Sequence, residues 1–128
     1  MDPIPVEVKR FIEINIDSVD QLEILRVLGE DPMKEWSATA LVQEVQTQVE
    51  TIGQHLSALQ VRGLLAINTQ GSELSCRYGA NNPETEDMIN KLLQVYRERP
   101  VTMINLVYAK ARRDIQSFAE AFRLKKEK

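Results

Sequence analysis

The chain has few of the residues that usually carry metal and nucleophile chemistry. Among its 128 residues are one cysteine, Cys76, one histidine, His55, and five glycines. A Cys/His zinc cluster takes four such ligands, so one chain cannot build it from two. A single cysteine forms no internal disulfide bond, which is typical of a protein from a reducing compartment. The sequence also has no glycine-rich phosphate-binding loop.

Catalysis has correspondingly little support. A nucleophile and base made from Cys76 and His55 would have no local signature, and a lone thiol in a strand is usually a small buried apolar group. A carboxylate-based site stays open as an alternative, although no motif points to one. We therefore expect a protein that is not an enzyme, with no catalytic residues, no metal site and no cofactor.

Long apolar runs are also missing. No uninterrupted stretch approaches the ~18 residues that a membrane span needs. The first five residues, Met1–Pro5, lack the basic start and apolar stretch of a signal peptide. We expect a cytoplasmic protein that makes no membrane contact. Hydrophobic residues make up 43% of the chain and charged residues 27%, which is ordinary for one folded domain with its own core.

Positive charge is scarce in the first part of the chain. Residues 1–80 hold 6 lysines and arginines against 12 acidic residues, a net charge of −6, whereas residues 81–128 hold 10 against 7, a net charge of +3. No lysine or arginine lies between Ser37 and Val61. A nucleic-acid binder normally carries a basic patch on the element that reads the bases, and here most cations lie in the tail.

Apolar spacing predicts helices in the first half of the chain. A short helix over residues 6–14 is favoured, although Ile12, Ile14 and Ile16 also alternate like a strand. Ser18 and Gln21 form a capping box before a helix that ends at Gly29. Its apolar face carries Leu22, Leu25 and Leu28. A loop over residues 30–35 leads to Trp36, which we expect to be a core wedge between helices.

Two further helices follow with a short turn between them. Ser37 or Thr39 caps the first, which carries Leu41, Val42 and Val45. Thr47 and Glu50 form a second capping box, and Gly63 ends the helix that follows. The apolar stripe of that helix consists of Val49, Ile52, Leu56 and Leu59. Two helices joined in this way indicate a helix-turn-helix.

The periodicity changes after Gly63. Residues 65–69 and 74–78 predict two strands, and Gln70–Glu73 between them have the composition of a turn. The fold class is therefore mainly α with a small β-hairpin, in a winged-helix domain over residues 1–80. The remaining predicted core residues are Leu64, Ile67 and Leu74.

The C-terminal part, residues 81–128, predicts a helical extension that belongs to the same compact unit. Its helices are expected from Pro83 to Arg99, from Val101 to Lys110 and from Asp114 to Phe122. Their apolar side chains exceed what one small domain can cover, so we expect a homodimer built on this extension. The alternative is that these helices fold back on the chain's own core. The expected interface residues are Met88, Leu92, Val95, Tyr96, Ile104, Val107, Tyr108, Ile115, Phe118 and Phe122.

The order of three helices and a hairpin, together with the segment TIGQHLSALQVRGLL at residues 51–65, resembles the winged helix-turn-helix superfamily. The resemblance covers residues 18–78 and is to small bacterial repressors of the arsenic-repressor and multiple-antibiotic-resistance types. In such repressors the tight turn before the recognition helix often carries glycine, where this chain has Gln46, and an apolar residue is common at Thr47. The chain also lacks a metal-ligand cluster of the arsenic-repressor kind.

The resemblance implies which residues would face double-stranded DNA. They are Thr47, Gln48, Glu50, Thr51, Gln54 and Ser57 on the recognition helix, with Arg62 and Arg77 as nearby cations. Gln54 would pair with adenine, and Thr51 or Ser57 would reach phosphates or bases. Two functions stay open: a DNA-binding transcriptional regulator whose affinity for DNA is weak, or a winged-helix module that binds another protein and not DNA.

Overall fold

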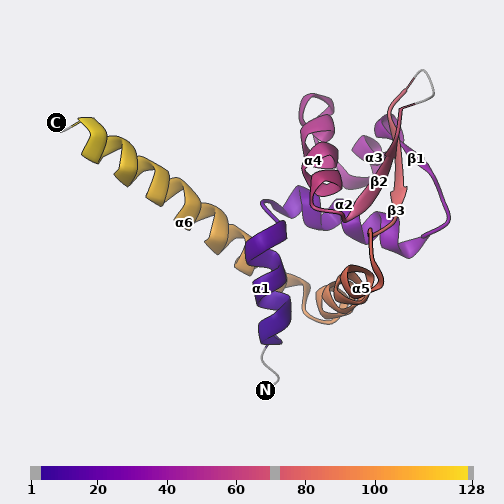
Figure 1. Cartoon of the computed structure of the whole chain (residues 1–128), viewed down its shortest axis with the longest axis horizontal. Helices are drawn as coiled ribbons and strands as arrows, with labels where there is room; N and C mark the ends of the chain where they lie inside the picture. Colours follow the sequence, from indigo (N-terminus) through magenta and orange to yellow (C-terminus); the bar gives the residue numbers. More distant parts are fainter. Residues whose placement is uncertain (1–3, 70–72, 127–128) are drawn as a thin grey trace.

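The computed structural model describes residues 4–69 and 73–126 of the chain (Figure 1). These residues form mostly helix with one small antiparallel sheet, which confirms the predicted fold class. The elements in chain order are α1 (Val6–Asn15), α2 (Val19–Glu30), β1 (Trp36–Ser37), α3 (Ala38–Val45), α4 (Val49–Val61), β2 (Leu65–Asn68), β3 (Ser75–Tyr78), α5 (Pro83–Glu98) and α6 (Pro100–Lys126).

The predicted start of α2 is confirmed, with one difference. Ser18 is the N-cap, and its hydroxyl accepts a hydrogen bond from the Gln21 backbone amide at 3.3 Å. The Gln21 side chain accepts from the amide of Asp17 at 2.9 Å, one residue earlier than a capping box requires. Gln21 is 3% exposed, so this polar side chain ties the α1–α2 connection to the body of the protein.

The helix-turn-helix is formed by α3 and α4. Ser37 caps α3 by accepting from the Ala40 amide at 3.1 Å. Gln46 ends the helix with a φ of +61°, a left-handed conformation that glycine adopts without strain. The prediction that Thr47 caps α4 is wrong: Gln48 is the N-cap and makes no side-chain cap. The Thr47 hydroxyl donates instead to Asp20 on α2, so it joins the turn between α3 and α4 to α2.

The sheet contains a strand that the sequence analysis did not predict. Its order is β1-β3-β2, because Trp36 pairs with Cys76 and Ile67 pairs with Cys76 on the other side. The prediction that Trp36 wedges between helices is wrong, since this residue begins β1 and is only partly buried. The ammonium group of Lys34 lies 3.8 Å from the centre of the Trp36 ring. Of the predicted hairpin turn, residues 70–72 lie outside the described residues.

One hydrophobic core joins the winged helix to the helices that follow it. Nine predicted core residues are buried: Leu22, Leu25, Leu28, Leu41, Val45, Ile52, Leu56, Leu59 and Leu64. Ile67 and Leu74 are partly buried. Val49 was predicted to lie in the core and is 69% exposed. It is the first residue of α4, whose buried positions begin at Ile52.

The C-terminal extension differs from the prediction in its last part. Asn82 caps α5, Pro83 is its first residue, and the helix ends before Pro100 as expected. The two helices predicted beyond Pro100 are one helix, α6, because residues 111–114 include no glycine or proline that would break it. Its first part packs on the body, whereas its C-terminal part extends away from it (Figure 1).

The structure divides the predicted interface residues into two groups. Leu92, Tyr96 and Val107 are buried in the protein's own core, and Met88, Val95 and Ile104 pack against that core. A second copy therefore has no access to the buried three. The second group is exposed to solvent. The exposed fractions are 53% for Tyr108, 70% for Ile115, 73% for Phe118 and 56% for Phe122.

Two glycines offer a paired test of this backbone. Gly63 follows α4 with a φ of +77°, where a Cβ would clash with the Asn81 side chain. Gly53 lies inside α4, and its Cβ would meet nothing within 4 Å. We expect Gly63→Ala to lower the free energy of unfolding by about 1–2 kcal/mol and Gly53→Ala to raise it by about 0.5–1 kcal/mol. Urea denaturation of both variants measures this, and equal effects would contradict the assigned end of α4.

Candidate nucleic-acid interface

One face of α4 is open to solvent, and it carries most of the predicted DNA-facing residues. Gln48, Glu50, Gln54 and Ser57 are all exposed. Glu50, Gln54 and Ser57 lie on the side of the helix opposite Ile52, Leu56 and Leu59, which are buried, and Gln48 is the N-cap of the helix. The second helix of a helix-turn-helix is the one that enters the major groove. Its free face here has the polar side chains that such a contact requires.

The two predicted threonines are less available. Both are partly buried. Thr47 donates its hydroxyl to the Asp20 carboxylate at 2.8 Å, and Thr51 donates to the backbone oxygen of Gln48 at 3.2 Å. These contacts hold the turn and the first turn of α4 in place. We therefore leave Thr47 and Thr51 out of the exposed face of α4, which we define by Gln48, Glu50, Gln54 and Ser57.

Arg62, the predicted phosphate contact at the end of α4, is held by the protein itself. Its guanidinium donates to the Asn15 carbonyl at 2.6 Å and to the Asp17 carboxylate at 2.8 Å. Its side chain is 28% exposed. A phosphate could use this cation only at the expense of those contacts, so Arg62 anchors the end of α4 to the α1–α2 connection.

A second cation reaches the same connection from α6. Lys110 is 6% exposed, and its ammonium group donates to the Ile16 carbonyl at 2.7 Å and lies 3.3 Å from the Asp17 carboxylate. Burial alone would raise the pKa of the Asp17 carboxyl. The hydrogen bonds and charges of Arg62 and Lys110 outweigh this and hold that pKa below its ordinary value of 3.8. Asp17 thus links α4 to α6.

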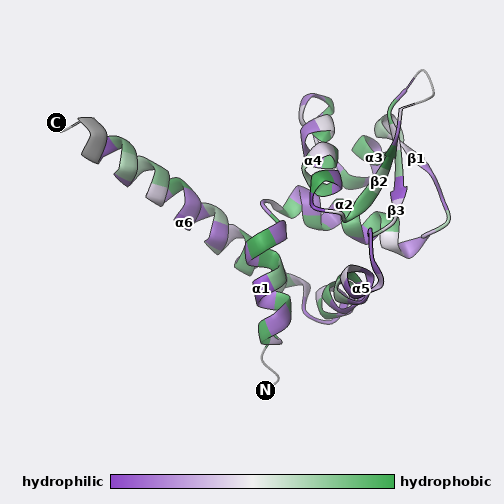
Figure 2. Cartoon of the chain, in the orientation of Figure 1, coloured by the Kyte–Doolittle hydropathy of each residue, from purple (hydrophilic) through white to green (hydrophobic). Residues whose placement is uncertain are grey.

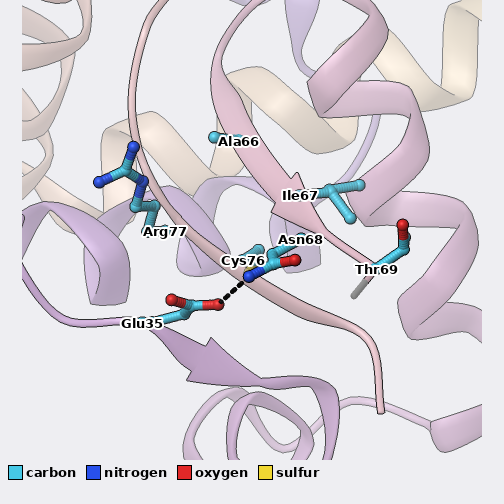
Figure 3. A pocket seen from close by; sticks show the side chains of 7 residues that line it. All are labelled: Glu35, Ala66, Ile67, Asn68, Thr69, Cys76 and Arg77. Atoms are coloured by element: carbon cyan, nitrogen blue, oxygen red, sulfur yellow. Dashed lines mark hydrogen bonds between the residues drawn. The ribbon is translucent and has the colours of Figure 1, made fainter. Parts of the chain in front are cut away.

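Arg77 is the exposed cation of the wing. It lies on β3 beside a hollow of roughly 490 Å³ that Figure 3 shows, lined also by Glu35, Asn68 and Cys76. The Glu35 carboxylate accepts from the Ser75 hydroxyl at 2.5 Å and from the Asn68 amide at 3.1 Å. These bonds, with the charge of Arg77, lower the pKa of Glu35. Glu35 therefore stays ionised at neutral pH and partly offsets the charge of Arg77.

A second carboxylate joins the wing to α3. Glu73 accepts from the backbone amide of Thr39 at 3.1 Å and from its hydroxyl. These two hydrogen bonds lower the pKa of the Glu73 carboxyl. A free amide in the first turn of a helix attracts anions, including DNA phosphates. At Thr39 that amide is already bonded to a carboxylate, which leaves it unavailable to a phosphate.

The electrostatics of this side of the molecule are therefore weakly unfavourable for DNA. Neither α3 nor α4 carries a lysine or arginine, while Glu44 and Glu50 are exposed. Cations that neutralise phosphates provide most of the sequence-independent affinity for DNA. The exposed face of α4 can thus contribute hydrogen bonds to bases but little attraction to the backbone.

The structure separates the two residues that were weighed as a nucleophile and its base. Cys76 is 1% exposed on β3, and burial, with a smaller effect from Glu35, raises the pKa of its thiol to about 12. His55 lies on α4, where its ring contacts Gln21 at 3.3 Å and Asp20 at 3.6 Å. The thiol is therefore protonated at neutral pH, and its burial fits the reading of Cys76 as a small core residue.

Neither metal ligands nor a membrane span stands out among residues 4–69 and 73–126. In these ranges no three His, Cys, Asp or Glu side chains come together as a candidate metal site. No helix in the same part of the chain combines the length and the apolar character needed to cross a bilayer.

Among known proteins, the chain is similar to several solved structures. No family model and no curated protein matches the chain. HlyU from Vibrio cholerae N16961 is 21% identical, with a TM-score of 0.54 over 69% of this chain and 91% of HlyU. A possible transcriptional regulator from Methanosarcina mazei Go1 is 17% identical, with a TM-score of 0.53 over 78% of this chain and 86% of its own. M. tuberculosis Rv0081 is 21% identical, with a TM-score of 0.52 over 82% of this chain and 96% of Rv0081.

These likenesses extend over 69% to 82% of this chain. At such low identity they establish an architecture and no more. The α3–α4 pair, the hairpin of β2 and β3, and the third strand β1 agree with it. The chain has the winged helix-turn-helix fold.

Proposed function

We propose that this protein is a DNA-binding transcriptional regulator. The observation that carries the proposal is the exposed face of α4, which is the second helix of the helix-turn-helix and has the wing beside it. The similar structure from Methanosarcina mazei Go1, described as a possible transcriptional regulator, supports the same function.

Base recognition would come from the middle of this face. Glutamine forms two hydrogen bonds with adenine in the major groove, and serine bonds either a base or a phosphate. Gln54 and Ser57 are exposed one helical turn apart, so they can address neighbouring positions of one site. Gln48, the N-cap of α4, would add a contact at the N-terminal end of the helix, where a recognition helix meets base edges.

Affinity would be weak and only moderately dependent on salt. Arg77 is the cation beside the wing, while Arg112 and Arg123 are exposed on α6. Arg62 and Arg113 are already paired with acidic residues. Each phosphate neutralised by a cation steepens the fall of log affinity with log salt by about 0.9, so we expect a slope of about one to three.

A titration of genomic DNA fragments at two salt concentrations tests this function. Arg77→Ala is expected to weaken binding to every fragment and to lower the salt slope by about one. Gln54→Ala is expected to weaken binding to the preferred fragment alone, by about 1–3 kcal/mol. Arg97→Ala and Gln94→Ala are matched controls, since both residues are exposed on α5. An equal loss in the controls would contradict the proposed surface.

A second candidate function is a protein-interaction module without DNA binding. Its specific support is that Val49 and Val61, at the two ends of α4, are 69% and 86% exposed on a helix without lysine or arginine. Apolar side chains on a surface of low charge are typical of protein interfaces. If no fragment binds even at low salt, while a defined protein is retained through α4 and lost with Val61→Glu, this second function replaces the first.

A further inference from the structure

The long helix α6 has an apolar stripe that the body of the protein covers only in part, at Ile104. Its 27 residues span about 40 Å. Val101, Tyr108, Ile115 and Phe122 recur every seven residues, and Ile104, Ala111 and Phe118 follow each of the first three at a distance of three. This is the heptad pattern with which two helices pack along each other. Figure 2 shows hydrophobic and hydrophilic residues alternating along this helix.

The stripe lies on a different face from the one that anchors α6. Met103, Val107 and Lys110 are buried against the body, and successive helical residues turn by about 100°. The stripe is consequently rotated by about a quarter turn from this anchoring face. Val101 and Tyr108 begin the stripe beside the anchored part and are 69% and 53% exposed. In the anchored part the body covers Ile104 in part and leaves Val101 and Tyr108 open.

Beyond the anchored part, the stripe continues into solvent. Arg113 pairs with Glu13 of α1, and all described side chains from residue 112 to residue 123 are exposed. Ile115 and Phe118 are 70% and 73% exposed. Helices of ~12–15 residues are marginal in water without tertiary packing. The outer part of α6, residues 112–123, is within this range and has exposed aromatic side chains, so a partner that covers them would stabilise it.

We propose that the stripe on α6 binds the same stripe of a second copy of this chain. The pattern itself favours a second copy, because heptad spacing matches another helix of equal pitch and not a flat surface or a rounded pocket. Ala119 and Ala121 flank the stripe in its outer half, so two copies can approach closely without bringing like charges together. Two-fold pairing of identical surfaces is the commonest form of oligomer.

The available area reaches what a specific dimer needs. Large aromatic and aliphatic side chains bury on the order of 100–200 Å² each. The four exposed residues Val101, Tyr108, Ile115 and Phe118 alone would then bury about 400–800 Å² per copy, or about 800–1,600 Å² in a pair. Specific interfaces begin near 1,000 Å². The predicted interface residues Leu92, Tyr96 and Val107, being buried in the core, take no part in it.

Sedimentation velocity of the full chain at micromolar concentration tests the proposal. The expected mass is twice the 14.6 kDa of one chain. Phe118→Glu places a charge in the stripe and is expected to weaken self-association by more than about tenfold. Ser117→Glu is the matched control, because it adds the same charge at the neighbouring residue on the opposite face and leaves the dimer intact. Far-UV circular dichroism shows whether α6 stays helical, and Phe118→Ala repeats the test without an added charge.

Several results would overturn the proposal. The wild-type chain could remain monomeric at high micromolar concentration, which would leave the stripe to another partner. A dimer that persists in both Phe118 variants would use another surface. A monomer that binds vesicles of anionic phospholipid, and loses this binding with Phe118→Glu, would assign the stripe to a membrane surface. Because none of these measurements uses DNA, they stand or fall separately from the proposed regulator function.

Discussion

Leu56→Ala is expected to lower the free energy of unfolding by about 2–5 kcal/mol. Leu56 is 0% exposed in the middle of α4 and belongs to the same core as Leu22 and Leu41. Removing three carbons there loses their burial and leaves a cavity among helices α2, α3 and α4, which contact one another directly. Since total stability of such domains is about 5–15 kcal/mol, this single change can remove a large share of it. Urea denaturation measures the loss.

The neighbouring residue supplies the control for this prediction. Ser57 is exposed on the opposite side of α4, and Ser57→Ala is expected to change stability by less than about 0.5 kcal/mol. A loss well under 1 kcal/mol for Leu56→Ala, or a similar loss in both variants, would mean that the faces of α4 are assigned incorrectly. The exposed face of α4 proposed for DNA would then be incorrect as well.

Lys110→Met is expected to cost about 1–3 kcal/mol at neutral pH, because it removes the donor to the buried Ile16 carbonyl. Methionine fills similar space and avoids burying an ammonium group, which limits the loss. Arg113→Met is the matched control on the same helix. Arg113 also pairs with α1, but its side chain is 61% exposed, and such surface pairs contribute about 0–1 kcal/mol.

The effect of Lys110→Met should also depend on pH. Asp17 has a pKa below 3.8 in the folded protein, partly through Lys110. A carboxyl with a lowered folded pKa stabilises the protein above its unfolded pKa, and this contribution is lost as the pH falls through the folded value. The stability difference between wild type and Lys110→Met should therefore shrink from pH 7 to about pH 3. Denaturation at both pH values measures it, and a constant difference would exclude a role for the Lys110–Asp17 pair.

The helix-turn-helix and wing could be predicted from sequence because their signals are local. The Ser18 cap, the spacing of Ile52, Leu56 and Leu59, and the change of period after Gly63 each depend on residues within one or two turns. The structure confirms all three. The side of α4 that faces solvent follows from the same spacing, so the candidate residues Gln54 and Ser57 were also within reach of the sequence.

Contacts between segments that lie far apart in the chain could not be predicted from the sequence. Trp36 has no local pattern that pairs it with Cys76, because a strand of two residues exists only through its partner. Thr47 has the spacing of a capping residue. Its hydroxyl instead donates a hydrogen bond to Asp20, which lies on another helix, far away in the chain. Val49 fits the apolar stripe of α4 and is left exposed at the end where the buried positions have not yet begun.

The sequence by itself determined which segments are helices, where the wing lies and that α4 carries no lysine or arginine. Only the tertiary structure decided which apolar side chains of the C-terminal helices are used internally. Leu92 and Val107 look the same in sequence as Ile115 and Phe118, but the first two are buried and the last two are exposed. The physical reason is that apolar spacing defines the face of a helix, whereas burial depends on whether another element reaches that face.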